Sequence, residues 1–571
     1  MEKLHSCLQI TDLKDMLDKT GKLYGDNPAY VFKTETKGKF KVITHKEVRE
    51  DINGLGTSLI KLGLKDKKIG VISENRYEWA IAYLSIAAGT GVVVPLDKSL
   101  PDNEIKNLIM RSEIEAIFYS KKYDNIMKQI KEEGNSNLKH FISMDLNKEE
   151  NGILSEKILI KEGIELINNG EKSFIDAKID NEKMGFLLFT SGTTAMSKGV
   201  MLSHKNICSN LMDIASVIEI TENDRLLSFL PLHHTFECTV GFLYPIYKGS
   251  SIAFCDGIRH IAENIKEYEI TAMISVPILY ENMYKKVIKG IEKKGKLKIV
   301  KKMIKLSNIL LKLKIDIRKK VFKDVHSTLG NKLRIFVSGG AALDNSVEKG
   351  FNDLGFKIVQ GYGLTETSPV IAAGNDKYTK IGTIGKKLPS VQIKIENSDE
   401  KGIGEIAVKG PNIMLGYYQN EEETKKVLKD EWFYTGDLGY IDKQGFIIIT
   451  GRKKNVIVLK NGKNIFPEEL EALINKVEGV KESFVYGKPD KDDDLKICAK
   501  IVYDENIMKE IYSLDIENEI YNILLEEVKK INKTMPPYKY IREVSVTKEE
   551  LVKTTTQKVK RHEELKKILQ K

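Results

Sequence analysis

The stretch Gly185-Phe-Leu-Leu-Phe-Thr190-Ser-Gly-Thr-Thr-Ala-Met-Ser-Lys198-Gly199 joins a short apolar run to a loop of hydroxyl residues, glycine and one lysine. The apolar run predicts a buried strand. The loop offers many hydrogen-bond donors, little bulk and one positive charge, which suits a triphosphate. It differs from the common P-loop, because no glycine precedes Lys198 and Gly199 follows it. Taken alone, such a run is also compatible with a plain linker.

On both sides of this loop, short β-branched runs alternate with helical patterns such as 76–88 and 102–111. Strands that alternate with helices predict parallel sheets covered by helices, and therefore the α/β class. The expected strands are 69–72, 92–94, 116–119, 252–255, 272–276, 333–338 and 357–360.

The chain has 571 residues, too many for one hydrophobic core, so at least two domains are expected. Residues 382–450 carry short alternating runs (391–395, 405–409 and 446–450) and many glycines, which predicts a β-rich subdomain. After Gly451-Arg-Lys-Lys-Asn455, a helix over 466–477, strands at 483–486 and 497–502 and a long helix over 515–531 indicate a separate α+β unit. We therefore expect a large N-terminal domain, 1–453, and a small mobile C-terminal lid, 454–571.

Composition excludes several classes of protein. The chain is 41% hydrophobic and 30% charged, as in ordinary globular proteins. Its five cysteines are sparse and lack CxxC spacing, which argues against a disulfide framework or zinc site and favours a cytoplasmic protein. The N-terminus has no apolar core of a signal peptide. The longest uncharged stretch, 80–96, is too short to span a bilayer and predicts a core helix, a turn and a buried strand.

The basic excess lies in one segment, Lys285–Lys323. It holds fifteen lysines and Arg318 against Glu292 and Asp316, a net charge of +14, whereas the whole chain carries +10. Apolar residues at near-helical spacing predict an amphipathic basic helix. Two interpretations stay open: a solvated helix packed on its own domain, or a docking surface for anionic lipids at the inner membrane face. No aromatic residue lies between Lys285 and Val321, so we expect no nucleic-acid partner.

Five further motifs follow the loop in order. They are Leu230-Pro-Leu-His-His234-Thr-Phe-Glu237, Ser338-Gly-Gly-Ala-Ala342, Gln360-Gly-Tyr-Gly-Leu-Thr-Glu-Thr367, Tyr434-Thr-Gly-Asp437-Leu-Gly and Lys553-Thr-Thr-Thr-Gln-Lys558-Val-Lys-Arg561. In this order and spacing, the set resembles the adenylate-forming (AMP-binding) superfamily of acyl-CoA synthetases, nonribosomal adenylation domains and luciferases. His233-His234, the stretch 461–471 and the insertion before Leu333 are most similar to the bacterial long-chain fatty acid–CoA ligases.

The resemblance implies an enzyme that uses ATP and Mg²⁺ to convert a long-chain fatty acid to acyl-AMP and then transfers the acyl group to coenzyme A, releasing AMP and pyrophosphate. Three alternatives stay open: ligation to acyl carrier protein, an aryl or short-chain acid as the substrate, and a non-catalytic, membrane-associated protein that binds acyl groups or nucleotide. The sequence leaves acyl chain length and oligomeric state, monomer or homodimer, undetermined.

The resemblance also implies roles for individual residues. The catalytic residues would be Lys558, Glu366, His234 and Thr190, with Thr190 and Glu366 as Mg²⁺ ligands and Lys454 as the hinge. Asp437 would accept hydrogen bonds from the ribose, with Arg452 nearby. The other nucleotide-binding residues would be Ser191, Gly192, Thr193, Thr194 and Lys198 at the phosphates, Gly339, Gly340, Ala341, Gly361 and Tyr362 around the adenine, and also Gly363 and Thr365.

Outside the motif set these residues have simpler readings: His233 and His234 as core histidines, and Lys558 as part of a solvated charge run. The chain also departs from the family pattern. Ala195 and Ser197 stand where the family has Gly and Pro, and Gln557 stands where Gly is usual. None of these changes removes a donor or a charge, so activity is expected to survive with altered ATP affinity.

Overall fold

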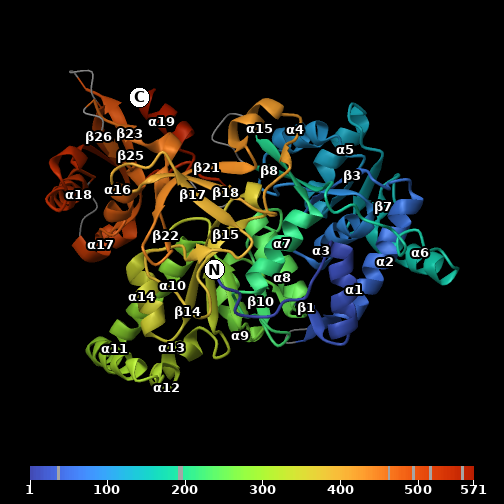
Figure 1. Cartoon of the computed structure of the whole chain (residues 1–571), viewed down its shortest axis with the longest axis horizontal. Coiled ribbons are helices and arrows are strands. Elements are labelled where there is room, and N and C mark those ends of the chain that lie inside the picture. Colours follow the sequence, from blue (N-terminus) through green and yellow to red (C-terminus); the bar gives the residue numbers. More distant parts are fainter. Residues whose placement is uncertain are drawn as a thin grey trace. The chain divides into compact units, whose positions relative to one another are not determined.

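The computed structural model describes residues 1–34, 39–190, 197–460, 463–490, 495–512, 517–554 and 559–570 (Figure 1). The described chain forms two compact units. The first contains Met1–Thr190, Ser197–Gln392 and Val408–Phe433, and the second contains Ile393–Ala407 and Tyr434–Lys571. Whether the chain turns about the predicted hinge at Lys454 stays a prediction.

The first unit contains an eight-stranded sheet with strand order β19-β9-β8-β4-β3-β5-β6-β7. Its strands from β8 to β7 are parallel, whereas β9 pairs antiparallel with both β8 and β19. The strands are β3 (Lys68–Ile72), β4 (Val92–Pro95), β5 (Ala116–Tyr119), β6 (His140–Ser143), β7 (Leu154–Ser155), β8 (Met184–Thr190), β9 (Lys198–Ser203) and β19 (Gly416–Tyr417).

A nine-stranded sheet in the same unit has the order β16-β15-β14-β13-β12-β10-β11-β1-β2. Its centre is parallel and its edge pairs are antiparallel. The strands are β1 (Pro28–Lys33), β2 (Phe40–Thr44), β10 (Arg225–Ser228), β11 (Ser251–Phe254), β12 (Ala272–Ser275), β13 (Ile335–Ser338), β14 (Lys357–Gly363), β15 (Val370–Ala373) and β16 (Lys386–Lys387). Both centres confirm the predicted parallel sheets.

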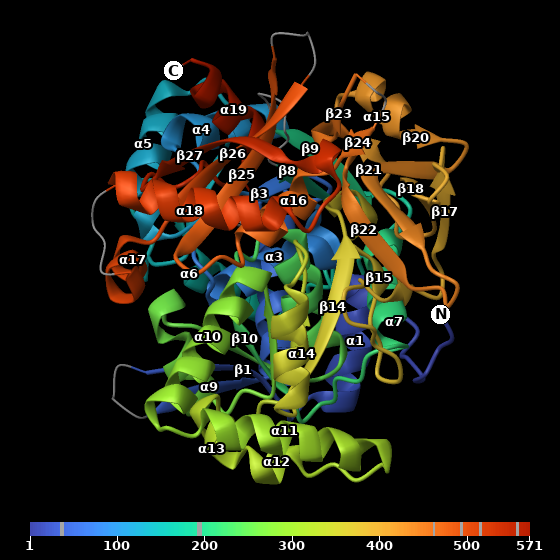
Figure 2. The ribbon, with the colours of Figure 1, turned by 90° about the vertical axis from the view of Figure 1, so that its left-hand side faces the viewer.

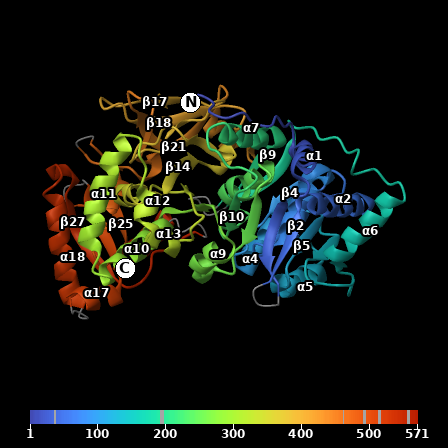
Figure 3. The ribbon, with the colours of Figure 1, turned by 90° about the horizontal axis from the view of Figure 1, so that it is seen from below.

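Helices pack beside these sheets, and α2 and α6 lie side by side (Figure 3). Helix α2 begins with a capping box in which Thr44 and Glu47 satisfy each other's backbone N–H groups. The helices of the first unit are α1 (Leu13–Tyr24), α2 (His45–Lys61), α3 (Tyr77–Ser85), α4 (Asp102–Ser112), α5 (Asp124–Glu133), α6 (Glu156–Asn168), α7 (His204–Ala215), α8 (Tyr244–Tyr247), α9 (Ile261–Glu267), α10 (Pro277–Lys293), α11 (Leu297–Lys312), α12 (Arg318–Val321), α13 (Lys323–Thr328), α14 (Asn345–Asp353) and α15 (Glu421–Val427).

The uncharged stretch 80–96 forms the predicted core helix, turn and strand. Helix α3 continues into a π-helical turn, Ile86–Thr90, in which Gly89 has φ +139°. A side chain would be strained at that φ, so glycine allows the chain to turn directly into β4. No described helix combines the length and apolar character that crossing a bilayer requires.

The basic segment is divided among several helices. Residues 285–293 belong to α10, α11 follows after a short break, and α12 and the start of α13 complete the segment. Figure 2 shows α11, α12 and α13 together at the lower edge of the first unit. The predicted amphipathic helix is therefore mainly α11.

The β-rich region is also confirmed. It contains β17 (Gln392–Glu396), β18 (Gly404–Lys409), β20 (Leu428–Lys429), β21 (Trp432–Ile441) and β22 (Ile447–Arg452). Within the first unit β20 pairs with the start of β21, and within the second unit β22 pairs with the rest of β21, both antiparallel.

The second unit has its own core. Strand β26 (Leu495–Tyr503) pairs antiparallel with β25 (Val480–Pro489) and parallel with β27 (Ile541–Thr547). Helices α16 (Pro467–Ile474), α17 (Glu505–Tyr512) and α18 (Glu517–Asn532) pack with one apolar cluster, and α19 (Arg561–Leu569) packs with another around Phe484 and Tyr486. A two-stranded pair, β23 (Ile457–Val458) and β24 (Asn464–Ile465), completes the predicted α+β unit.

Candidate functional site

The β8–β9 hairpin places Thr190 opposite Lys198. The two residues are register partners, and the Thr190 hydroxyl donates a hydrogen bond to the Lys198 carbonyl at 3.4 Å. Arg111, on α4, donates to the carbonyl of Ser197 at 2.9 Å. Ser191, Gly192, Thr193, Thr194 and Ala195 lie outside the described residues. The hairpin thus fixes both ends of the predicted phosphate loop.

Two side chains hold the Lys198 ammonium: Tyr417 of β19, the other partner strand of β9, and Glu423 of α15, the helix after it. The ammonium forms an ion pair with Glu423, and it lies 4.7 Å from the centre of the Tyr417 ring. The Lys198 and Lys426 ammonium groups lower the pKa of Glu423 to about 2, so this carboxylate is ionised at neutral pH. Lys198 therefore has an anionic partner within the first unit.

Glu366 joins the same group of side chains. It lies in a short turn, Thr365–Thr367, directly after β14. Its Oε1 atom accepts a hydrogen bond from the Tyr417 hydroxyl at 2.9 Å, and its carbonyl accepts from the Met414 N–H at 2.9 Å. Burial, and then the neighbouring Glu366 carboxylate, raise the pKa of Tyr417. Tyr417 thus connects two predicted site residues, Glu366 and Lys198.

The chain approaches itself closely at the end of β14. A side chain at Gly363 would place its Cβ 1.7 Å from the Pro369 carbonyl oxygen, so only glycine fits there. The amide of Asn412 donates to the Thr367 carbonyl at 2.9 Å and holds the turn from the other side. These contacts fix the backbone that presents Glu366.

Glycines gather at the carboxyl ends of two adjacent strands. Ser338, the last residue of β13, is the register partner of Gln360 in β14, so Gly339–Ala341 and Gly361–Tyr362 reach the same sheet edge. Gly340 has φ +85°, which favours glycine. Beside Gly361 a Cβ would meet nothing closer than 3.8 Å, so this backbone is open to approach. Such an edge is where α/β sheets bind ligands.

The His233-His234 loop lies next to the Glu366 turn. The hydroxyls of Thr235 and Thr365 are 3.1 Å apart. The N–H of Phe236 donates to His234 Nδ1 at 3.4 Å, and His233 Nε2 lies 3.4 Å from Asp97 Oδ1. The Phe236 ring packs closely against Gly339, because a Cβ added at position 339 would lie 2.7 Å from that ring. The histidine loop and the glycine edge are therefore neighbours.

Glu237, the last residue of the histidine motif, is fully buried. Its Oε1 accepts a hydrogen bond from the Ser228 hydroxyl at 2.7 Å, and its Oε2 has no partner among the described residues. Burial raises the pKa of Glu237 to about 8, so the carboxyl is mostly protonated at neutral pH.

Asp437 and Arg452 form a pair within the second unit. They are register partners on β21 and β22, and Arg452 Nε lies 2.7 Å from Asp437 Oδ1. Asp437 is buried, whereas Arg452 is exposed. Lys454 is exposed in the turn Lys453–Asn455, and Lys453 pairs with Glu405 at 2.7 Å. Lys558 and Gln557 lie outside the described residues.

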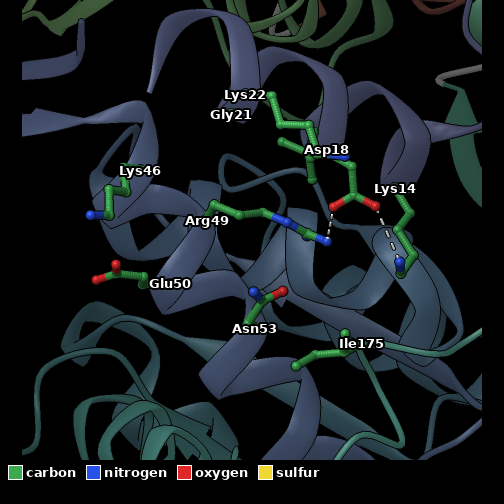
Figure 4. Close-up of a pocket in the computed structure, with 10 residues that line it drawn as sticks. Lys14, Asp18, Gly21, Lys22, Lys46, Arg49, Glu50, Asn53 and Ile175 are labelled. Carbon is green, nitrogen blue, oxygen red and sulfur yellow. Dashed lines mark hydrogen bonds and ion pairs between the residues drawn. The ribbon is translucent and has the colours of Figure 1, made fainter. Parts of the chain in front are cut away.

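A separate cavity of about 360 Å³ lies between α1 and α2 and contains none of the predicted site residues (Figure 4). Arg49 pairs there with Asp18 Oδ1 at 2.5 Å, and Lys14 reaches Asp18 Oδ2 at 3.2 Å. Arg49 Nη1 and Asn53 Oδ1 have no partner within the described chain, but both atoms are inaccessible to solvent. A ligand in this cavity could not reach them without rearrangement.

The first unit thus brings together Thr190, Lys198, Thr365, Glu366 and the His234 loop. Sequence reasoning missed Tyr417, Glu423, Glu237 and Arg111. Tyr417 and Glu423 come from a segment more than 200 positions after Lys198. Glu237 stood inside a quoted motif, and the available sequence signal was the uncharged stretch 238–247 that follows it.

Comparisons with known proteins identify a family that matches most of the chain. Residues 17–418 match the family described as AMP-binding enzyme, and residues 469–558 match the AMP-binding enzyme C-terminal domain. Fatty acyl-CoA synthetase B of Dictyostelium discoideum is 29% identical over 91% of this chain and 83% of its own length. A chloroplastic long-chain-fatty-acid–[acyl-carrier-protein] ligase of Arabidopsis thaliana is 26% identical over 78% of this chain and 71% of its own length.

Among solved structures, the anthranilate CoA ligase AuaEII in complex with anthranoyl-AMP superimposes with a TM-score of 0.76. It is 20% identical, and the match covers 98% of this chain and 97% of that one, which supports the fold. The family match extends over most of the sequence, through the β8–β9 hairpin and the glycine edge. This chain belongs to the AMP-binding enzyme family.

Proposed function

We propose that this protein uses ATP to activate a long-chain fatty acid as its acyl-adenylate and then transfers the acyl group to coenzyme A, releasing AMP and pyrophosphate. One observation carries the chemistry: Tyr417 holds Glu366 through its hydroxyl and Lys198 against its ring, beside Thr190. In this proposal Lys198 is the phosphate-binding cation and Glu366 is the acidic oxygen ligand, and Tyr417 contacts both. The names of the relatives support the acyl substrate and the thiol acceptor.

In this proposal the hairpin loop binds the β- and γ-phosphates. Lys198 supplies positive charge, and the hydroxyls and N–H groups of the loop donate hydrogen bonds. Gly339–Ala341 and Gly361–Tyr362 receive the flat adenine, because backbone without bulk allows a ring to approach closely. Asp437 accepts hydrogen bonds from the ribose hydroxyls.

The residues present also fit Mg²⁺. Within the described residues no cluster of three or more His, Cys, Asp or Glu side chains could hold a metal. Mg²⁺ commonly needs only one or two carboxylates, because phosphates and water complete its shell. Glu366 supplies a carboxylate, and the Thr190 hydroxyl is a second hard oxygen donor. When bound, Mg²⁺ would neutralise charge on the departing pyrophosphate.

The substrate carboxylate attacks the α-phosphate, so no protein nucleophile is required. Two anions approach each other in this step, and Lys558 would stabilise the charge that builds between them. A rotation of the C-terminal domain about Lys454 would then withdraw Lys558 and admit the thiol of coenzyme A. The thiol attacks the mixed anhydride, and AMP leaves.

A second acceptor has specific support. One relative carries the name of an acyl-carrier-protein ligase, and the phosphopantetheine thiol of that carrier is chemically the same as that of coenzyme A. Of these two thiol acceptors, we propose coenzyme A.

The test is acid-dependent pyrophosphate exchange across saturated acids from acetate to stearate, with aryl acids included. We expect the highest rate with long-chain acids. A second assay measures AMP release with coenzyme A or acyl carrier protein as the sole acceptor. Exchange only with short or aryl acids would refute the substrate, and AMP release only with the carrier would refute the acceptor.

A further inference from the structure

Helix α11 has two apolar faces. Leu297, Val300, Met303 and Ile304 pack against the core of the first unit. Asn308 anchors the helix further by donating to Asp353 Oδ1 of α14 at 2.9 Å. One face of the helix is therefore fully explained by packing within the fold.

The second face is exposed to solvent. Ile299, Leu306 and Ile309 are 61%, 46% and 59% exposed, and Leu313, just after the helix, is 67% exposed. Residues seven and three positions apart lie on one side of a helix, so these four side chains form one apolar strip. Of the nineteen large apolar side chains exposed in the described chain, six lie within residues 299–315. A helix that served only its own domain would have a polar outer face.

Lysines border this strip. Lys298, Lys305 and Lys312 repeat at the same seven-residue spacing, and Lys301 and Lys302 lie between them. All five are exposed, and within the described chain none of the five forms an ion pair. Only two acidic residues lie in the whole segment Lys285–Lys323, and one of them, Asp316, is paired with Arg318. The positive charge of the surface is therefore not neutralised by the protein itself.

We propose that this α11 surface, made of the apolar strip and its five lysines, docks the protein on an anionic lipid bilayer. Apolar side chains would enter the boundary between headgroups and acyl chains, and the lysine ammonium groups would contact the lipid phosphates. Long lysine stems allow the charge to stay at the headgroups while the strip is buried. Docking of this kind needs no ATP or acid, so its test is independent of the proposed reaction.

The experiment is sedimentation of the full-length protein with vesicles, without substrates. Vesicles of phosphatidylcholine with phosphatidylglycerol are compared with phosphatidylcholine alone. We expect binding to the anionic vesicles that weakens as salt is added. Combined Lys298→Gln, Lys301→Gln, Lys305→Gln and Lys312→Gln should weaken it at least about tenfold. Combined Ile299→Ser, Leu306→Ser and Ile309→Ser should reduce it to a similar degree.

Matched controls remove the same charge or apolar area elsewhere in the first unit. For the lysines, the control is Lys128→Gln, Lys161→Gln, Lys172→Gln and Lys178→Gln, all exposed. For the strip, it is Leu23→Ser, Met110→Ser and Ile258→Ser, which are also exposed. Both controls should bind like the unchanged protein, and thermal unfolding should show that every variant is folded.

Three results would overturn the proposal. The first is equal binding to neutral and anionic vesicles, or none to either. The second is an equal loss in a control and its matched variant, which would make overall charge or apolarity the cause. The third is that the serine variant changes the mass measured by sedimentation velocity while vesicle binding persists. A second copy of the chain would then be the partner of the strip.

Discussion

The Lys198 ammonium and the Glu423 carboxylate form an ion pair beside the Tyr417 ring. Bound ATP phosphates would compete with Glu423 for the same lysine. If Lys198 binds the phosphates as proposed, the Glu423 carboxylate holds the same cation and would oppose nucleotide binding.

Glu423→Gln should lower the KM for ATP about two- to fivefold, because a partly exposed ion pair contributes up to about 1 kcal/mol. Steady-state kinetics at saturating acid measures this. Glu422→Gln is the control, since Glu422 pairs with Lys426 rather than Lys198. A rise in the KM for ATP would show instead that Glu423 orients Lys198 productively.

Tyr417→Phe keeps the ring beside Lys198 but removes the hydroxyl that donates to Glu366. A hydrogen bond to a charged group contributes about 1.5–3 kcal/mol, so the Mg²⁺ concentration for half-maximal rate should rise about tenfold or more. The KM for the fatty acid should not change. Tyr418→Phe serves as the control, because the Tyr418 hydroxyl contacts Glu113 instead. An unchanged Mg²⁺ dependence would exclude this positioning role for Tyr417.

Glu237 should make stability depend on pH. Its pKa is about 8 in the folded protein, against an ordinary value of 4.5. Between these values the folded state holds more protons than the unfolded state, so stability falls as pH rises, by about 1.4 kcal/mol per pH unit from this group. The loss ends above about pH 8.

Glu237→Gln retains an oxygen acceptor for Ser228 and removes the titration. Denaturant unfolding should be measured between pH 5 and 9. As the pH rises, the free energy of unfolding of the variant should increase relative to that of the unchanged protein, by on the order of a few kcal/mol. The exposed Glu162→Gln should show no such trend. Parallel pH profiles for Glu237→Gln and the unchanged protein would contradict the raised pKa.

Lys454→Pro fixes the backbone at the predicted hinge, since proline locks φ. Pyrophosphate exchange should survive and thioester formation should be lost, because only the second half-reaction requires rotation. Lys454→Ala should retain both activities. If Lys454→Pro lost both half-reactions equally, the result would contradict the assignment of Lys454 as the hinge.

Lys558→Ala should reduce acid-dependent pyrophosphate exchange at least about a hundredfold, through loss of the charge that stabilises the adenylation step. Transfer from acyl-AMP supplied in advance should continue. Lys560→Ala is the neighbouring control, because Lys560 pairs with Glu563. Undiminished exchange in Lys558→Ala would remove this lysine from the mechanism.

Much of the fold could be predicted from local pattern. The runs at β3, β4, β5, β11 and β12 are short and apolar, so these strands could be predicted. Their predicted ends lie within one residue of the ends in the structure. The antiparallel pairing of β9 with β8 could not be predicted in this way. Direction is decided by the short loop that joins the two strands, because a parallel return would need a crossover.

The site also contains residues that the sequence predicts and residues that it does not. Residues within motifs, such as Glu366 and Lys198, could be proposed because their neighbours in sequence carry the pattern. Tyr417 and Glu423 could not, since they reach Lys198 only after β19 has paired with β9. The raised pKa of Glu237 likewise comes from its burial in the folded protein, which the sequence around it does not reveal.

The three-stranded sheet β25-β26-β27 is covered on both faces by helices of the same unit, α16 and α18 on one and α19 on the other. Such a body keeps its apolar interior closed at every orientation it could adopt. A change in its orientation would leave these two internal clusters buried, so they would not be exposed to water. A catalytic cycle that requires two arrangements of this unit could therefore run without partial unfolding at each turnover.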